Sequence, residues 1–253
     1  GIGFNICMHN LQWNNVTIKY VITGLVNGGS IVTTYWFFMP LYAAYLAIPL
    51  FSAVEKEKRK SVYVYISVVG FLLNVLIPFA AKFTDWVPYN PGFRLFVNMS
   101  YLFYVVVGWL LHTQEIKRKD RIVIYILAIL GLFTNMIGTY FLSMRDGTVN
   151  KTFNGYNDVP CILYAIGVFV LIKQIAPKIM DVKWIRAIVV YLNKYTFGVY
   201  LLHWSVLKAV IRLTRVNEVS LIWRLLSPIG IVAVCVAIIW IIRKIPVLKH
   251  VVP

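Results

Sequence analysis

The chain has 253 residues, of which 60% are hydrophobic and 13% carry a charge, and its mean hydropathy is +0.76. This composition excludes an ordinary soluble globular protein, in which about a quarter of the residues are charged, and it predicts an all-α protein whose helices cross a membrane several times. The net charge of +16 does not indicate binding to nucleic acid, because the Lys and Arg residues cluster in short loops between apolar segments.

Taken in chain order, a mixed lead-in at residues 1–30 contains a short apolar element at 18–26 and is followed by apolar segments long enough to span a bilayer. Seven such segments are expected, at residues 31–54, 62–81, 96–113, 122–143, 159–175, 194–211 and 221–242. Between the fifth and the sixth, residues 182–191 combine Lys183 and Arg186 with Trp184 and predict an amphipathic helix at the membrane surface. The loops are too short to hold a second domain, so one domain over residues 1–253 is expected.

The distribution of Lys and Arg predicts the orientation of these segments. Alternate connections at 55–60, 115–121 and 173–186, with the tail at 243–253, hold 15 of the 25 basic residues, whereas those at 82–95, 144–158 and 208–219 hold 7. Because basic loops stay in the cytoplasm, the seven-span bundle is expected to have its N-terminus outside and its C-terminus in the cytoplasm.

The sixth segment carries a histidine near its middle. At 1.5 Å per residue, His203 lies roughly 13 Å beyond Lys194, near the centre of a hydrocarbon layer about 30 Å thick. Thr196, Tyr200 and His203 follow the spacing i, i+4, i+7 and share one helix face. An ionisable side chain at this depth must face the protein interior or water. The face is therefore either a substrate-binding surface or a hydrogen-bonded packing surface.

Asn74 and Asn135 lie on polar or small-residue stripes of the second and fourth segments. Together with His203 they suggest a polar cavity, and the alternative interpretation is helix packing. All nine carboxylates lie in or beside loops, which argues against an ion-coupled transporter and against a metal site. The three cysteines match neither a zinc motif nor a disulfide framework.

Two outward loops mix aromatic and hydrogen-bonding side chains, which suits stacking on a sugar. The alternative is an aromatic belt at the membrane interface. The residues concerned are Trp86, Tyr89, Phe93, Arg94, Phe153, Asn154, Tyr156 and Asp158.

Two segments carry a resemblance to a known family. Residues 34–51 read Thr-Tyr-Trp-Phe-Phe-Met-Pro-Leu-Tyr-Ala-Ala-Tyr-Leu-Ala-Ile-Pro-Leu-Phe, and residues 194–203 read Lys-Tyr-Thr-Phe-Gly-Val-Tyr-Leu-Leu-His. Both resemble segments of acyltransferase family 3, in the same order. The resemblance implies ten spans with both ends in the cytoplasm, so this chain would correspond to the C-terminal seven spans.

The resemblance also implies an activity. Family members transfer an acyl group, commonly acetyl from cytoplasmic acetyl-CoA, to hydroxyls of cell-surface glycans and related acceptors, typically in a bacterial cytoplasmic membrane. Acetyl-CoA is then a substrate, and no bound cofactor is expected. Trp36, Tyr200 and His203 match the family segments and become candidate substrate-binding residues. The family's catalytic pair, a basic residue and a histidine about ten positions apart, has no counterpart here. It is expected upstream of Gly1, and the chain alone is expected to be inactive.

Arg118 and Arg121 lie in a connection expected to be cytoplasmic, where they are candidates for binding CoA phosphates. The alternative is that they act only as determinants of orientation. A transporter or flippase for glycan or lipid fits the polar stripes equally well. A seven-span receptor fits less well, because the last segment has no central lysine and the cytoplasmic loops are short.

Overall fold

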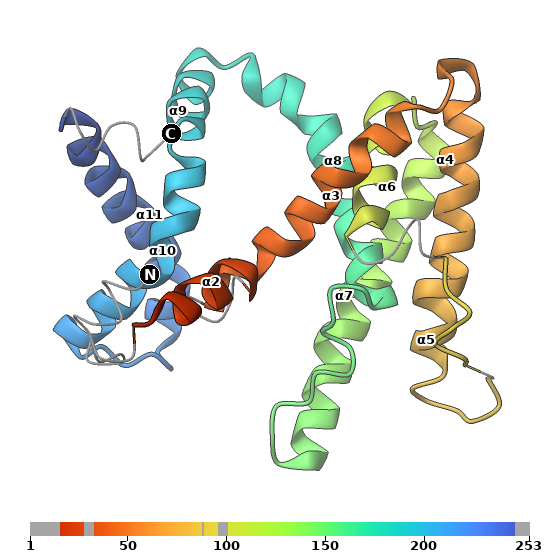
Figure 1. Ribbon diagram of the computed structural model, residues 1–253, viewed down its shortest axis with the longest axis horizontal. Coiled ribbons are helices and arrows are strands. Elements are labelled where there is room, and N and C mark those ends of the chain that lie inside the picture. The colour runs from red at the N-terminus through yellow and green to blue at the C-terminus, as the bar shows by residue number, and fades with distance from the viewer. Residues whose placement is uncertain (1–15, 28–32, 88, 96–100, 246–253) are drawn as a thin grey trace. The chain divides into compact units, whose positions relative to one another are not determined.

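The computed structural model describes residues 16–27, 33–87, 89–95 and 101–245 (Figure 1). Within these ranges every regular element is a helix, which confirms the predicted all-α fold. The elements are α2 (Ile18–Asn27), η2 (Thr33–Phe37), α3 (Phe38–Ser52), α4 (Lys56–Phe71), η3 (Leu72–Leu76), α5 (Ile77–Ala80), α6 (Leu102–Thr113), α7 (Arg118–Asp146), α8 (Val159–Met180), α9 (Lys183–Asn193), α10 (Thr196–Thr214) and α11 (Leu221–Lys244).

Among the described residues, five helices are long and apolar enough to cross a membrane, namely 34–52, 56–80, 118–146, 159–180 and 221–244. The remaining two predicted segments are also helical. Helix α6 has only 12 residues, and the start of its predicted segment, residues 96–100, lies outside the described residues. Helix α10 has 19 residues and carries Lys208 and Arg212 in its second half. Membrane helices are confirmed, while the number seven and the orientation remain predictions.

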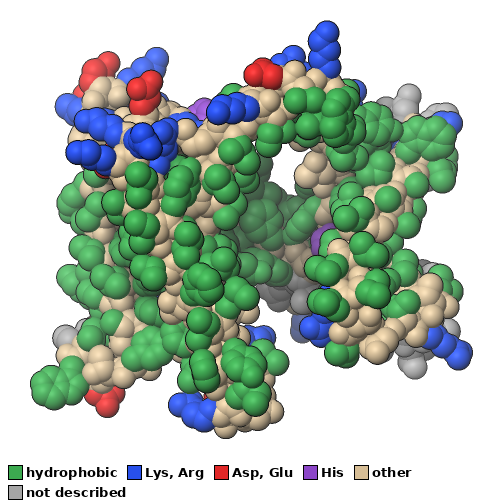
Figure 2. Space-filling model, turned by 180° about the vertical axis from the view of Figure 1, so that it is seen from behind, with side chains coloured by type: hydrophobic (Ala, Val, Ile, Leu, Met, Phe, Trp, Pro, Cys, Tyr) green, Lys and Arg blue, Asp and Glu red, His purple; other side chains and the backbone are tan. Residues whose placement is uncertain are grey.

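The surface has the character expected of a protein dissolved in lipid. Large apolar side chains point outward from the long helices, for example Leu46 at 80% exposed, Phe141 at 66% and Ile229 at 72%. Figure 2 shows hydrophobic side chains over most of the visible face of each unit, with the Lys, Arg, Asp and Glu side chains in separate groups. In water such a surface would be unfavourable, whereas in a bilayer it is the favourable one.

The chain divides into two compact units, one formed by Gly1–Met39 with Ile179–Pro253 and the other by Pro40–Lys178. We call them the first and the second unit. The single domain over residues 1–253 remains a prediction.

In the second unit, the charged residues that follow α3 begin the next helix. The sequence predicts a break at residues 55–60, but α4 already begins at Lys56, because a helical turn can be solvated at the membrane surface. The Arg59 guanidinium donates to the carbonyls of Ser52 (3.0 Å) and Val54 (2.9 Å). It thereby satisfies carbonyl groups that the end of α3 leaves without helical partners.

The helix from Lys56 to Ala80 changes its hydrogen-bond pattern in the middle. A π-helical turn, η3, interrupts it at Leu72–Leu76, just before Pro78. Proline has no N–H for the carbonyl of Asn74, four residues earlier, and a π-turn is one way in which a helix accommodates such a gap. The predicted second span is therefore one continuous but irregular element.

Helices α7 and α8 approach each other closely at glycines. A Cβ added to Gly131 would lie 2.8 Å from the Pro160 carbonyl oxygen, and one added to Gly167 would overlap the Cβ of Ala128. Small residues allow two membrane helices to come close enough for extensive packing. Gly131, on the small-residue stripe that also carries Asn135, therefore lies at this helix contact.

In the first unit, α10 and α11 lie side by side (Figure 1). Their contact is centred on the buried residues Val206, Ile231 and Cys235. Tyr195, at the start of α10, is also buried and has the Arg243 guanidinium over its ring at 4.7 Å. This packing fixes the helix that carries His203.

Candidate functional site

The segment of residues 34–38 is bound to α10 by two reciprocal hydrogen bonds. The Tyr200 hydroxyl donates to the carbonyl of Thr34, and the Tyr35 hydroxyl donates to the carbonyl of Leu201 at 3.1 Å. Both segments that carry the family resemblance therefore meet in the first unit, although 166 residues separate the bonded pairs.

Aromatic rings surround this junction. The Tyr200 ring contacts Phe37 and Phe38, with ring centroids 6.0 and 5.7 Å apart, and the His203 ring at 5.8 Å. Trp36 packs edge-on against Phe37 at 6.0 Å and is 37% exposed. We call these five residues the aromatic cluster. It joins three of the predicted substrate-binding residues, Trp36, Tyr200 and His203, through neighbouring rings.

The His203 imidazole is half-buried and turned back toward its own helix. Its Nδ1 lies 2.6 Å from the carbonyl oxygen of Tyr200 and 3.2 Å from that of Val199. A carbonyl oxygen only accepts hydrogen bonds, so Nδ1 carries the hydrogen and donates it. In the neutral imidazole the lone pair is then on Nε2, which can accept a hydrogen bond or a proton.

Thr196, the third predicted residue on α10, lies one turn before Tyr200. Its side chain is exposed, and its hydroxyl lies 3.5 Å from the carbonyl of Leu192. The neighbouring Phe197 instead contacts the cluster, with its ring 6.3 Å from that of Phe38. The structure therefore brings Phe197, and not Thr196, to the aromatic rings.

Asn74 and Asn135 belong to the second unit, and both hold loops. The Asn74 side chain donates to the carbonyl of Leu95 and accepts from its N–H, each at 2.9 Å. The Asn135 amide donates to the carbonyl of Phe153 at 2.6 Å. Hydrogen bonds of this kind satisfy loop backbone close to apolar helices. The polar cavity predicted from these two residues and His203 remains a prediction.

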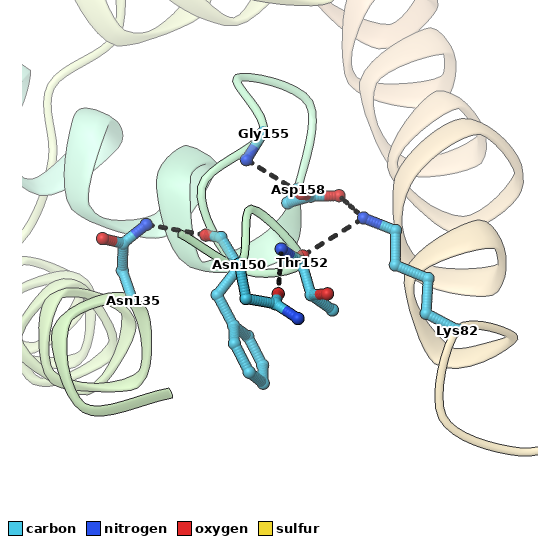
Figure 3. Close-up of polar contacts among 7 residues, drawn as sticks. Lys82, Asn135, Asn150, Thr152, Gly155 and Asp158 are labelled. Atoms are coloured by element: carbon cyan, nitrogen blue, oxygen red, sulfur yellow. Dashed lines mark hydrogen bonds and ion pairs between the residues drawn. The ribbon is translucent and has the colours of Figure 1, made fainter. Parts of the chain in front are cut away.

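An ion pair that the sequence analysis did not single out, Lys82 with Asp158, lies on the other side of the loop that Asn135 contacts (Figure 3). Lys82 Nζ is 2.6 Å from Asp158 Oδ1 and 3.3 Å from the Thr152 carbonyl, while the other oxygen of Asp158 accepts from the Gly155 N–H at 3.0 Å. In the sequence, Lys82 is the first residue of loop 82–95 and Asp158 is the last residue of loop 144–158, the two loops predicted to face outward. The ion pair could have been predicted from these two opposite charges, because each lies directly beside an apolar segment.

Aromatic side chains pack around the loop that contains Asp158. Phe83 stacks on Phe153 at 5.2 Å, and the Tyr104 hydroxyl donates to the carbonyl of Tyr156. Tyr156 itself remains 60% exposed and Trp86 94% exposed. Of the predicted sugar-stacking residues, Trp86, Tyr156 and Phe93, which is 68% exposed, present open rings.

Charged residues gather at another end of the second unit, where α4 and α7 begin (Figure 2). Arg118 is exposed in the first turn of α7, and Arg121 donates to the side-chain oxygen of Gln174 at 2.6 Å. The Lys173 ammonium contacts the carbonyls of Leu111, His112 and Gln114 at 2.6 to 2.9 Å. Lys173 therefore satisfies the end of α6, and Arg118 points its charge outward.

Helices of this length and composition, joined by short polar loops, define a multi-pass membrane protein. A family model described as an acyltransferase domain matches residues 2–243, and the chain belongs to acyltransferase family 3. No curated protein and no solved structure matches the chain. The protein is therefore a membrane acyltransferase by family.

Proposed function

We propose that the protein transfers an acetyl group from cytoplasmic acetyl-CoA to a hydroxyl of a cell-surface glycan, in the cytoplasmic membrane of a bacterium. The observation that carries the proposal is the family match over residues 2–243, together with the meeting of the two family-like segments at Tyr200, whose ring lies beside that of His203. In this reaction the thioester C–S bond breaks, an ester C–O bond forms, and the hydroxyl proton passes by way of a base to the CoA thiolate.

His203 could bind either the acyl carbonyl or the acceptor hydroxyl, and its tautomer favours the hydroxyl. Donation from Nδ1 to the Tyr200 carbonyl leaves Nε2 as an acceptor, which suits a substrate hydroxyl better than an acyl carbonyl. His203 would hold the acceptor hydroxyl, or receive its proton, while Tyr200 and Trp36 form an aromatic wall for the sugar. In the second unit, the exposed rings of Trp86 and Tyr156 offer separate surfaces on which a sugar could stack.

The acceptor role is tested with the full-length protein in membrane vesicles supplied with radiolabelled acetyl-CoA and glycan. His203→Ala should lower the rate of acetyl transfer by about 100-fold or more, the usual contribution of a proton-transferring side chain. His112→Ala is the matched control, because His112 is an exposed histidine of α6, and it should retain the rate. Equal rates in both variants contradict the role, and glycan movement without label incorporation favours a transporter.

Arg118 and Arg121 are proposed to bind the CoA phosphates, since guanidinium groups pair well with phosphate and the start of α7 presents unbonded N–H groups. Arg118→Gln should raise the KM for acetyl-CoA by about tenfold, equivalent to about 1.4 kcal/mol, with little change in kcat. Arg145→Gln, at the other end of α7, is the control. A protein that merely inserts differently would lose active molecules, and hence kcat, at unchanged KM.

A further inference from the structure

The first unit contains an apolar groove between α9 and α11 that the aromatic cluster does not use. Its volume is about 530 Å³, within the range of small-molecule sites. Tyr191 and Leu192 of α9 form one wall, and Ile229, Ala233, Ala237 and Trp240 of α11 form the other. The four α11 residues follow i, i+4, i+8 and i+11, so they share one helix face over about 17 Å. Because Ala233 and Ala237 have small side chains, they leave the space that forms the groove.

Basic side chains stand at the Trp240 end of this groove. The Lys244 ammonium lies 3.5 Å from the centroid of the Trp240 ring. One residue earlier, the Arg243 guanidinium donates to the Lys194 carbonyl at 2.7 Å. Neither α9 nor α11 contains an Asp or Glu. The groove is therefore apolar along its length and positively charged at one end.

This arrangement matches the chemistry of a lipid with a negative headgroup. Trp240 and Tyr191 are residues of the kind that lie at the membrane interface, and Lys and Arg just beyond such residues attract anionic headgroups. A chain lying along Ala233 and Ala237 would place its headgroup beside Lys244. We propose that the groove between α9 and α11 binds one anionic phospholipid, with an acyl chain along α11 and the phosphate at Lys244. This inference does not depend on acyl transfer.

The test uses the full-length protein in vesicles made of equal parts phosphatidylcholine and phosphatidylglycerol, with a photoreactive group on the acyl chain of one lipid at a time. Cross-linked residues are mapped by mass spectrometry. The phosphatidylglycerol probe should label residues 229–240 about fivefold more than the phosphatidylcholine probe, the preference that one juxtamembrane lysine supplies. Ala237→Leu fills the groove and should remove most of this labelling. Lys244→Gln should remove the preference for phosphatidylglycerol, and Lys244→Arg should keep it.

Two matched variants serve as controls and should behave like the unmodified protein. Lys208→Gln removes a second lysine that lies over a tryptophan, 5.1 Å from the Trp204 ring in α10. Val234→Leu enlarges a residue on another face of α11. Equal labelling by the two lipids, or labelling that Ala237→Leu does not change, overturns the proposal. Absence of lipid labelling at residues 229–240 also overturns it, because protein would then cover the groove.

Discussion

Lys82 and Asp158 hold opposite charges at the edge of an apolar bundle, with side chains 37% and 12% exposed. Removing the ammonium leaves a largely buried carboxylate that, among the described residues, still accepts a hydrogen bond only from the Gly155 N–H. Breaking a fully buried pair costs about 3 to 5 kcal/mol. Since Lys82 is partly solvated, Lys82→Met should lower the free energy of unfolding by about 2 kcal/mol. The measurement is reversible denaturation of the purified protein in mixed micelles.

A second ion pair in the same unit provides the control. Lys58 lies 2.8 Å from Glu55, with both side chains mostly exposed at 71% and 65%. Lys58→Met should change the unfolding free energy by less than about 0.5 kcal/mol. Adding Asp158→Asn to Lys82→Met should recover part of the loss, because the amide is neutral and its oxygen still accepts from Gly155. Similar effects of Lys82→Met and Lys58→Met would show that the Lys82 pair is solvated.

At the scale of single residues, the sequence predicted side chains that lie together in one cluster, but it did not predict their contacts with distant parts of the chain. Tyr200 and His203 were identified from helix spacing and family resemblance, and they do share one cluster with Trp36. The bond from Tyr200 to Thr34 joins residues far apart in the chain, and no local pattern encodes it. Asn74 and Asn135 were predicted to line a cavity from their positions on helix stripes. Their hydrogen bonds to the backbone of Leu95 and Phe153 could not be predicted from those stripes, because the partners lie in loops.

Helices α7 and α8 offer a test of packing at the scale of elements. A side chain at Gly167 would collide with Ala128, and both positions lie on well-defined helices. Gly167→Val should therefore destabilise the protein by about 1 to 3 kcal/mol, the usual cost of overpacking. Ala128→Gly in the same chain should restore much of the stability by making room. Thermal unfolding in detergent, followed by tryptophan fluorescence, measures both changes.

Gly108 is the matched control, because a Cβ at this helical position meets nothing within 4 Å. Gly108→Ala should be neutral or stabilising by up to about 1 kcal/mol, since alanine restricts the unfolded chain and favours helix. If Ala128→Gly failed to rescue Gly167→Val, the crossing of α7 and α8 would be placed differently.

Elements were predicted well where hydropathy alone decides them, as in α7, α8 and α11. Their ends were less predictable. Helix α7 extends to Asp146, where Gly147 adopts a left-handed conformation with φ of +65°, so the loop turns at a glycine, as helix C-termini often do. At 29 residues the helix is about 43 Å long, more than a hydrocarbon layer requires. The length of an apolar segment therefore underestimates the length of a helix that continues beyond the membrane into water.

For the whole molecule, span count and orientation rest on whether α6 and α10 cross the membrane. Helix α6 is about 18 Å long, and α10 carries Lys208 and Arg212, whose long side chains can reach the interface from within a span. If α10 crosses as α7 and α8 do, residues 119 and 194 lie on one side of the membrane, and residues 151 and 218 lie on the other.

Single cysteines at these four positions, in a chain whose three native cysteines are replaced by serine or alanine, allow the test. A membrane-impermeant maleimide applied to intact cells should label Lys151→Cys and Glu218→Cys. Lys119→Cys and Lys194→Cys should react only after the cells are opened, because basic connections stay in the cytoplasm. Labelling of Lys194→Cys and Glu218→Cys from the same side would mean that α10 does not cross. His203 would then lie outside a spanning helix, and its proposed contact with an acceptor in the membrane would fail.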